Sequence, residues 1–251
     1  EGLLEEGWEE FGAPLKTKTR LRKPKSHSVQ FEDDVWCQLY RLGYRMFNVD
    51  EKFCLPFGQD NSDKKQIDVV AIDDDSVLLI ECKSSHVSAK APSFKTEFEA
   101  LRLRLDGYKK SIEQAFGPGR RIKYIFATRN LRISRNSVDI QRLVESGGFY
   151  YNDNTFQYVD SLLKSYRDAA HYQFMGLIMK GQSISKEEIE VPAIEGTMGG
   201  KTYYMFSLEP QTLLKIGFVL HRTRANETEM PTYQRLLLPA RLKGITKFID
   251  G

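Results

Sequence analysis

The sequence predicts an α/β fold with a mixed sheet flanked by helices, followed by a second, partial α+β module. The first observation behind this prediction is that helical and strand-length apolar patterns alternate along residues 31–164, as they do in α/β domains. The second is a change in composition near residue 167, after which polar stretches separate short strand-like segments. We therefore expect an N-terminal arm or linker over residues 1–29, a first domain over 30–166 and a partial second module over 167–251.

Apolar spacing and turn residues define the expected elements in order. Apolar residues at spacings of three and four predict a first helix that Gly43 ends, and these residues are Phe31, Val35, Leu39 and Leu42. Two apolar runs joined by acidic residues 73–75 predict a β-hairpin with strands over 66–72 and 77–82. The other expected elements of the first domain are a short strand over 44–49, a polar loop over 52–64, a helix over 97–116, a strand over 122–127, a helix over 137–144, a strand over 149–151 and a helix over 155–164. The second module is expected to contain a helix over 169–178 and strands over 191–194 and 202–206.

Composition and cysteine usage narrow the class of protein. With 251 residues, of which 41% are hydrophobic and 28% charged, the chain can bury a full hydrophobic core. Cys37, Cys54 and Cys82 form no CxxC pair, which argues against a disulfide framework or a zinc site and fits a reducing cytoplasm. No apolar run approaches the roughly 20 residues that span a bilayer. We therefore expect a cytoplasmic protein without a membrane partner.

The distribution of charge says more about partners than the net charge of +3 does. Two basic groups are suited to neutralising phosphates, although a solvated tail explains the first of them equally well. The first group is Lys16, Lys18, Arg20, Arg22, Lys23 and Lys25, and the second is Arg120, Arg121, Lys123, Arg129, Arg132 and Arg135. DNA is the expected partner, and Arg129 is a candidate contact to it.

Asp68, Glu81 and Lys83 form the constellation most suited to chemistry. Glu81 and Lys83 are two residues apart on one expected strand, so they should project from the same face, and the hairpin brings Asp68 beside them. Ile80 and Cys82 should point the opposite way, into the core. Two adjacent carboxylates repel each other, and a divalent cation such as Mg²⁺ or Mn²⁺ removes that cost. Such an ion also polarises a phosphodiester and activates water, while a lysine can orient that water or balance charge on phosphorus.

A competing interpretation is an edge hairpin whose polar face is merely solvated. An Asp followed by a Glu-x-Lys sequence occurs by chance in many unrelated proteins. The context favours a functional site. Residues 77–80 are unusually apolar and imply a buried strand that ends abruptly in charges. A helix before this hairpin and a long helix after it complete the expected surroundings.

Residues 66–85, QIDVVAIDDDSVLLIECKSS, resemble the core motif of the PD-(D/E)XK nuclease superfamily, near its Mrr-like and RecB-like branches. In element order the resemblance covers residues 31–164. It implies a restriction-endonuclease-like fold and metal-dependent cleavage of DNA. It also implies that Asp68 and Glu81 are metal ligands and that Lys83 is the catalytic lysine.

Other positions match the superfamily less closely. Glu32 stands where many relatives carry an acidic residue that supports the metal site, although a solvated glutamate stabilised by the helix dipole is an equal alternative. Ile67 replaces the proline of the superfamily's name. Arg104 and Tyr108 have the spacing of the glutamine-and-tyrosine motif of RecB-like members, but Arg104 is not glutamine. These two are candidates for contacting the scissile phosphate, with a core position as the other role of Tyr108.

Four stretches of the second module, FSLEP at 206–210, KIG at 215–217, HR at 221–222 and residues 233–245, resemble the start of the DGQHR domain. DndB-like proteins, which are associated with bacterial DNA phosphorothioate modification, contain this domain. Its naming motif is absent here, so we expect the chain to be a piece of a longer protein. Candidates for an anion or DNA site, against surface ion pairing as the alternative, are His221, Arg222, Arg235 and Arg241.

Two functions follow as expectations. The first is a Mg²⁺-dependent DNA endonuclease of bacterial restriction or defence, with a homodimer as one expected assembly. The second is a DNA-binding regulator of phosphorothioate modification that keeps a vestigial nuclease fold. The complete set of Asp68, Glu81 and Lys83 favours the enzyme, because a vestigial site would be free to lose a member. RNA is a weaker expectation, since the sequence lacks an aromatic-rich RNA-binding signature.

Overall fold

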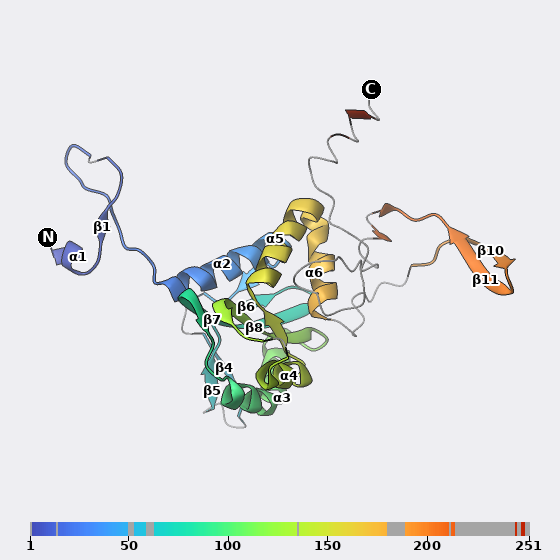
Figure 1. Cartoon of the computed structure of the whole chain (residues 1–251), viewed down its shortest axis with the longest axis horizontal. Coiled ribbons are helices and arrows are strands. Elements are labelled where there is room, and N and C mark those ends of the chain that lie inside the picture. Colours follow the sequence, from blue (N-terminus) through green and yellow to red (C-terminus); the bar gives the residue numbers. More distant parts are fainter. Residues whose placement is uncertain are drawn as a thin grey trace.

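The structure is a computed structural model that describes residues 2–13, 15–49, 53–58, 63–134, 136–179, 189–210, 212–213, 244 and 247–248. Its centre is a five-stranded mixed sheet flanked by helices, which confirms the predicted fold class (Figure 1). In spatial order the strands are β3 (Met46–Phe47), β6 (Val69–Ile72), β7 (Ser76–Lys90), β8 (Arg121–Arg132) and β9 (Phe149–Tyr151). The pairs β3–β6 and β6–β7 are antiparallel, whereas β7–β8 and β8–β9 are parallel.

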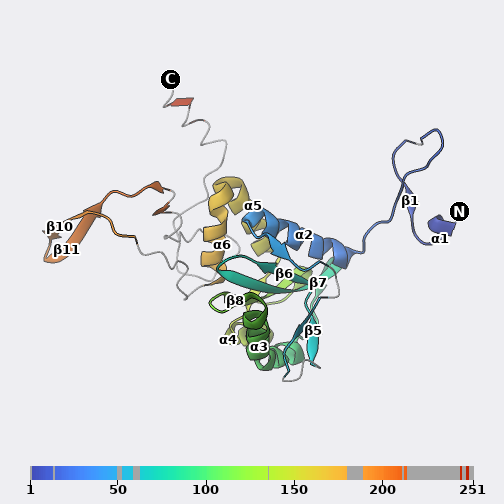
Figure 2. The ribbon, with the colours of Figure 1, turned by 180° about the vertical axis from the view of Figure 1, so that it is seen from behind.

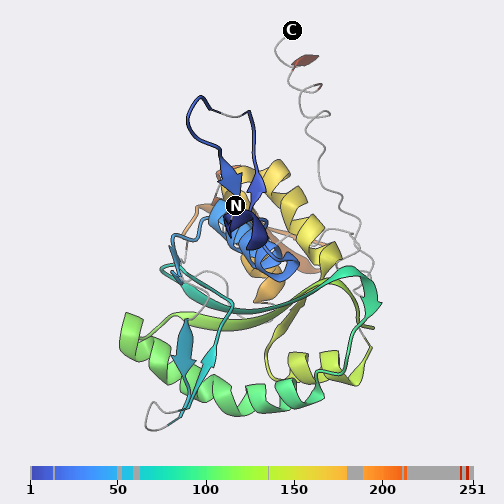
Figure 3. The same cartoon turned by 90° about the vertical axis from the view of Figure 1, so that its left-hand side faces the viewer.

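Helices cover both faces of this sheet (Figure 3). One face carries α2 (His27–Leu42), α5 (Asp153–Tyr166) and α6 (Ala170–Ile178), with the 3₁₀ turn Arg167–Ala169 between the last two, and the other face carries α3 (Lys95–Phe116) and α4 (Val138–Glu145). Strand β7 contributes to both cores because successive side chains of a strand face opposite sides. Leu78 and Ile80 lie in the core with α2, whereas Val77 and Leu79 lie in the core with α3.

Helix α2 ends as predicted but begins earlier. Its apolar residues are buried at the predicted spacing, and Gly43 terminates it with a φ of 114°, a conformation that favours glycine. Its first residue is His27 rather than Phe31, because the Ser26 side chain caps the helix by accepting a hydrogen bond from the Val29 N–H at 3.4 Å.

The prediction of a loop over residues 52–64 is wrong in part, because this segment contains a strand. Strand β4 (Cys54–Pro56) pairs antiparallel with β5 (Lys64–Gln66) in a separate two-stranded hairpin. The strand predicted over 66–72 is likewise interrupted at residues 67 and 68, so that β5 and β6 are distinct. The lysines of β5 break the apolar alternation on which the strand prediction depends.

Strands β7 and β8 extend well beyond the predicted 77–82 and 122–127. They stay paired through an irregularity between Ser84 and Ala89. Residues 83–90 of β7 are partly or fully exposed, so they lack the apolar pattern that marks the buried part. The end of the buried run in β7 is therefore also the place where the strand leaves the core.

Helix α6 packs in the core of the first domain, although the sequence suggests a boundary at residue 167. Its buried residues lie with those of α2 and α5, and they are Ala170, Phe174, Met175 and Ile178. The hydrophobic core therefore continues to Met179. Beyond it, β10 (Ala193–Met198) and β11 (Lys201–Phe206) form an antiparallel hairpin.

The N-terminal arm consists of α1 (Gly2–Glu5), β1 (Glu9–Glu10) and β2 (Leu21–Arg22). It leads into the N-terminal end of α2 and extends away from the layered core (Figure 2). Among the described residues, no helix combines the length and apolar character that crossing a membrane requires.

Candidate active site

Strand β7 delivers Glu81 and Lys83 to one face of the sheet. Glu81 is buried, with 6% of its surface exposed, whereas Lys83 lies where β7 leaves the core and keeps 38% of its side chain exposed. The Lys83 Nζ donates to Glu81 Oε1 at 2.6 Å, which confirms that the two project together. Ile80 and Cys82 are buried on the opposite side, in the core with α2, as predicted.

Asp68 reaches this pair from the chain just before β6. Its Oδ2 accepts the Cys82 N–H at 2.7 Å, directly beyond the last paired residues of β6 and β7. The carboxylate thus satisfies an N–H that pairing with β6 no longer reaches. Asn48 fixes the backbone around Asp68: its Nδ2 donates to the Asp68 carbonyl at 3.1 Å, and its Oδ1 accepts the Val70 N–H at 2.9 Å.

A lysine that the sequence does not single out completes the cluster. The Lys65 Nζ lies 2.6 Å from Glu81 Oε2 and 3.3 Å from Oε1 of Glu97, in the first turn of α3. Both oxygens of Glu81 therefore carry an ammonium partner. No sequence pattern identifies Lys65 or Glu97, because their meeting depends on how the β4–β5 hairpin packs against α3.

These contacts set the charges in the cluster. Burial raises the pKa of Asp68, and the nearby charge of Glu81 raises it further. Burial would also raise the pKa of Glu81, but Lys65 and then Lys83 outweigh burial and hold that pKa below its ordinary value. Burial would lower the pKa of Lys83, but its hydrogen bond to Glu81 and that residue's charge outweigh burial and raise this pKa. Lys83 therefore stays a cation, and Asp68 is the carboxyl group that an added cation would help to ionise.

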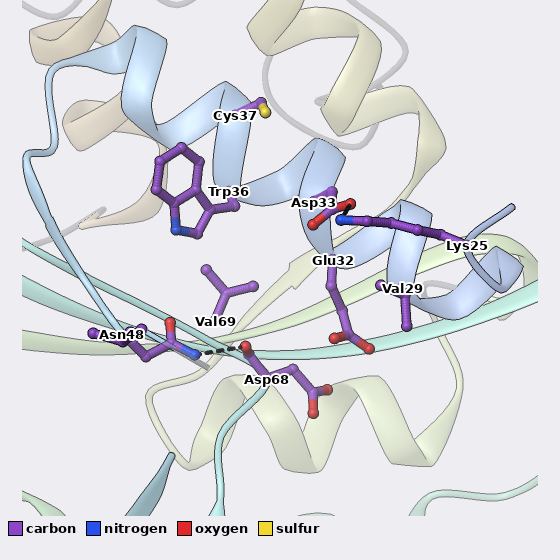
Figure 4. Close-up of a pocket in the computed structure, with 10 residues that line it drawn as sticks. Lys25, Val29, Glu32, Asp33, Trp36, Cys37, Asn48, Asp68 and Val69 are labelled. Atoms are coloured by element: carbon purple, nitrogen blue, oxygen red, sulfur yellow. Dashed lines mark hydrogen bonds and ion pairs between the residues drawn. The ribbon is translucent and has the colours of Figure 1, made fainter. Parts of the chain in front are cut away.

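Helix α2 brings Glu32 toward Asp68 across a pocket of about 810 Å³. Figure 4 shows the two carboxylates pointing toward one another, Glu32 from α2 and Asp68 from the chain before β6. Lys25 lines the same pocket. Because α2 begins at His27, Glu32 lies beyond the first helical turn, so stabilisation by the helix dipole does not explain its position.

The carboxylates suit a hard divalent cation but do not form a ready-made site. Asp68 and Glu81 offer the oxygen ligands that Mg²⁺ and Mn²⁺ prefer, and Glu32 adds a carboxylate on the pocket side. Within the described part of the chain, no group of three or more His, Cys, Asp or Glu side chains is arranged to hold a metal ion. Lys65 and Lys83 instead neutralise Glu81, so a cation bound there would replace at least one ammonium.

The candidate phosphate contacts on α3 take different positions. Tyr108 is only 1% exposed, and burial raises its pKa to about 12, so it occupies the core position that the sequence left open. Arg104 remains partly exposed and places its guanidinium over the ring of Phe57, 5.1 Å from the ring centre. Of the two, Arg104 is the one whose charge can reach a ligand.

Of the candidate DNA contacts elsewhere in the chain, Arg129 lies among the described residues. Arg129 pairs with Asp34 at 2.6 Å and lies over the ring of Phe31, 4.5 Å from its centre. Its position on β8 is directly beyond the residue that pairs with Lys83, so it lies at the same end of the sheet as the cluster. The remaining candidates lie outside the described residues, and they are His221, Arg222, Arg235 and Arg241.

Replacing Asp68 with asparagine is expected to raise the melting temperature of the metal-free protein at neutral pH. The folded-state pKa of Asp68 is raised above its unfolded value, so its ionisation costs stability as the pH rises through the raised pKa. Below the ordinary value of 3.8 the carboxyl is protonated in both states, and the advantage of Asp68→Asn should vanish. Circular dichroism melts in EDTA at neutral and acidic pH measure this difference. A wild-type protein that melts higher at neutral pH would contradict the expected cost.

No protein-family model matches the sequence, and no curated protein matches it. A solved structure described as "Crystal Structure of Protein of Unknown Function AF1548" has a TM-score of 0.37 and 14% sequence identity, and the match covers 57% of this chain and 78% of that chain. A likeness of this size carries no argument about function. The geometry of the cluster is therefore what bears on function.

Proposed function

We propose that the chain is a Mg²⁺- or Mn²⁺-dependent DNA endonuclease of bacterial restriction or defence, as its resemblance to the PD-(D/E)XK superfamily implies. The observation that carries this proposal is the convergence of Asp68, Glu81 and Lys83 where the buried part of β7 ends. Partial burial of three ionisable groups costs free energy that a solvated hairpin would avoid. Binding of a cation and a phosphate explains why such a cost would be retained.

Each side chain has a distinct task in the proposed reaction. Asp68 and Glu81 would hold the cation, with Glu32 as a further carboxylate on the pocket wall. When bound, the cation supplies a water of lowered pKa and neutralises the phosphate. Lys83 keeps its proton because its pKa is raised, and it donates a hydrogen bond to the attacking water or to a phosphate oxygen that gains negative charge. Lys83 therefore acts as a cation rather than as a general base.

Plasmid cleavage tests this proposal. Supercoiled DNA incubated with the purified chain and Mg²⁺ or Mn²⁺ is expected to become nicked or linear, and EDTA should prevent both products. The substrates include DNA with ordinary linkages and DNA with phosphorothioate linkages, because the resemblance of the second module concerns that modification. Intact plasmid in every metal-containing reaction would contradict the proposal.

The exposed N-terminal arm supports duplex DNA as the substrate. Lys25 lies on the wall of the pocket, and the arm carries further basic side chains outward from the start of α2. These exposed residues are Lys16, Lys18, Arg20, Arg22 and Lys23. The basic stretch 16–23 contains no acidic residue and leads to Lys25 on the pocket wall, so it would hold a duplex near the cation site.

Deleting residues 1–24 is expected to weaken DNA binding and to reduce the slope of log K against log salt by about three, because fewer phosphates are neutralised. Fluorescence anisotropy with one DNA duplex over a series of salt concentrations measures this slope. The matched control replaces the same residues with a glycine–serine arm of equal length, which should behave like the deletion. An unchanged slope would exclude a role of the arm in binding, whatever the outcome for cleavage.

One observation favours a second function, a DNA-binding regulator of phosphorothioate modification with a vestigial nuclease fold. Lys65 already neutralises Glu81, as in an ion-pair network that needs no metal. Such a protein would bind DNA in a salt-sensitive manner and cleave none of the plasmid substrates. The binding and cleavage assays together therefore separate the two functions.

A further inference from the structure

The two ion pairs of Lys65 affect how tightly the proposed site would bind a divalent cation. An inference about this affinity rests on the proposed function. We infer that Lys65 is a built-in competitor of the divalent cation. Its ammonium bridges Glu81 and Glu97 in the metal-free protein and keeps only Glu97 when the cation binds.

The position of Lys65 is fixed by the packing of the β4–β5 hairpin against α3. Gly107 of α3 makes room for this hairpin, because a Cβ there would lie 2.1 Å from the Phe57 carbonyl oxygen. The Ser111 hydroxyl donates to the Pro56 carbonyl at 2.8 Å and ties the same helix to the same hairpin. Lys65 therefore extends from an anchored strand, and its contact with the cluster is part of how α3 and the hairpin fit together.

Lys65 has two carboxylate partners on different elements. Its Nζ lies 2.6 Å from Glu81 on β7 and 3.3 Å from Glu97 on α3. All three side chains are at least partly buried, with exposed fractions of 25% for Lys65, 7% for Glu81 and 22% for Glu97. An ammonium on a flexible four-carbon stem can move between two such carboxylates with a small change of torsion angles.

Competition follows from the occupancy of Glu81. Both of its oxygens carry an ammonium, so a divalent cation needs one lysine to leave. If Lys83 left Glu81, the ammonium group proposed to act on the phosphate would be displaced. If Lys65 left, it would still be paired with Glu97. The exchange leaves no buried charge without a partner, which keeps its free-energy cost low. The affinity for metal is then set jointly by the site carboxylates and by the pair Lys65 and Glu97.

Mn²⁺ binding in the absence of DNA, measured by calorimetry, tests the exchange. Lys65→Met removes the competing ammonium and is expected to lower the Mn²⁺ Kd about tenfold. Glu97→Gln removes the remaining partner of Lys65 and is expected to raise the Kd severalfold. The matched control is Lys64→Met, on the neighbouring exposed position of β5, which should leave the Kd unchanged.

The double variant Lys65→Met/Glu97→Gln separates exchange from simple electrostatics. If Glu97 acts through Lys65, Glu97→Gln should lose most of its effect once Lys65 is methionine. A Glu97→Gln effect of equal size in both backgrounds would mean that Glu97 acts as a ligand or through its own charge, and would overturn the inference. An unchanged Kd in Lys65→Met would overturn it as well.

Further outcomes distinguish this inference from the proposed function. Absence of Mn²⁺ binding in every variant contradicts the metal-dependent function and the inference together. Binding in Lys65→Met but not in wild type supports the inference in its strongest form. If Lys65→Met does not fold, Lys65→Arg decides instead. Its guanidinium keeps the charge and can engage both carboxylates, so it should weaken Mn²⁺ binding, and an unchanged Kd would overturn the inference.

Discussion

Replacing Lys83 with alanine is expected to lower the rate of metal-dependent DNA cleavage by about 10²- to 10³-fold, the usual loss when a group that stabilises transition-state charge is removed. The fold should survive this change. Glu81 keeps its second ammonium partner, Lys65, at 2.6 Å, and Lys83 is partly exposed, so the loss of stability should be about 1 kcal/mol or less.

Single-turnover cleavage at saturating metal, combined with a thermal melt of each variant, measures both effects of Lys83→Ala. Lys90→Ala is the matched control, because Lys90 is an exposed lysine on the same strand, beyond the cluster. DNA binding should be nearly unchanged in both variants, since one lysine contributes little to a whole phosphate-binding surface. Cleavage by Lys83→Ala at the wild-type rate would remove Lys83 from the proposed mechanism.

The sequence predicts the central sheet and its helices because their signals are local. Helix α2 shows apolar residues every three or four positions, and residues 77–80 of β7 form a continuous apolar run. The ends of helices and strands are harder to predict from apolar spacing. The outer part of β7 pairs with β8 through backbone hydrogen bonds while its side chains are largely exposed, so no apolar pattern marks it.

The residues of the candidate site also differ in whether local sequence signals predict their positions. Glu81 and Lys83 lie on one strand, so their shared face follows from strand geometry alone. The predicted hairpin accounts for Asp68 lying beside them, but no hairpin pattern predicts its side-chain hydrogen bond to the Cys82 N–H beyond the last β6–β7 pair. Lys65 enters from a hairpin that the sequence presents as a polar loop, and its contact with α3 depends on tertiary packing.

Helix α6 illustrates a different limit of sequence reasoning. A change in composition near residue 167 indicates a boundary, yet Phe174 and Met175 are buried against the same sheet face as α2. Tyr44 shows how closely α6 joins the first domain, because its hydroxyl contacts both Ser76 of β7 and the Met175 sulfur. A shift in composition reports polarity along the chain, whereas the extent of a core depends on which faces meet in space.

Replacing Asp68 with asparagine is expected to weaken Mn²⁺ binding by at least about a hundredfold and to abolish cleavage, because the charged ligand is lost. The local structure should persist. The asparagine Oδ1 can still accept the Cys82 N–H that Asp68 accepts at 2.7 Å, and the clamp by Asn48 involves only the Asp68 backbone carbonyl. Calorimetric titration with Mn²⁺ and plasmid cleavage measure the two losses.

Comparison with Asp68→Ala separates the charge of Asp68 from its hydrogen bond. Alanine removes the acceptor as well, so the Cys82 N–H loses its partner and the protein should lose about 1–3 kcal/mol of stability that Asp68→Asn retains. Asp106→Asn, an exposed carboxylate on α3, is the control for the loss of one negative charge and should bind Mn²⁺ as the wild type does. If Asp68→Asn and Asp106→Asn bind Mn²⁺ equally well, Asp68 is a structural acceptor for β7 and the cation site lies elsewhere. If only Asp68→Asn fails to bind, the wild-type Asp68 carboxylate both accepts the Cys82 N–H and ligates the metal.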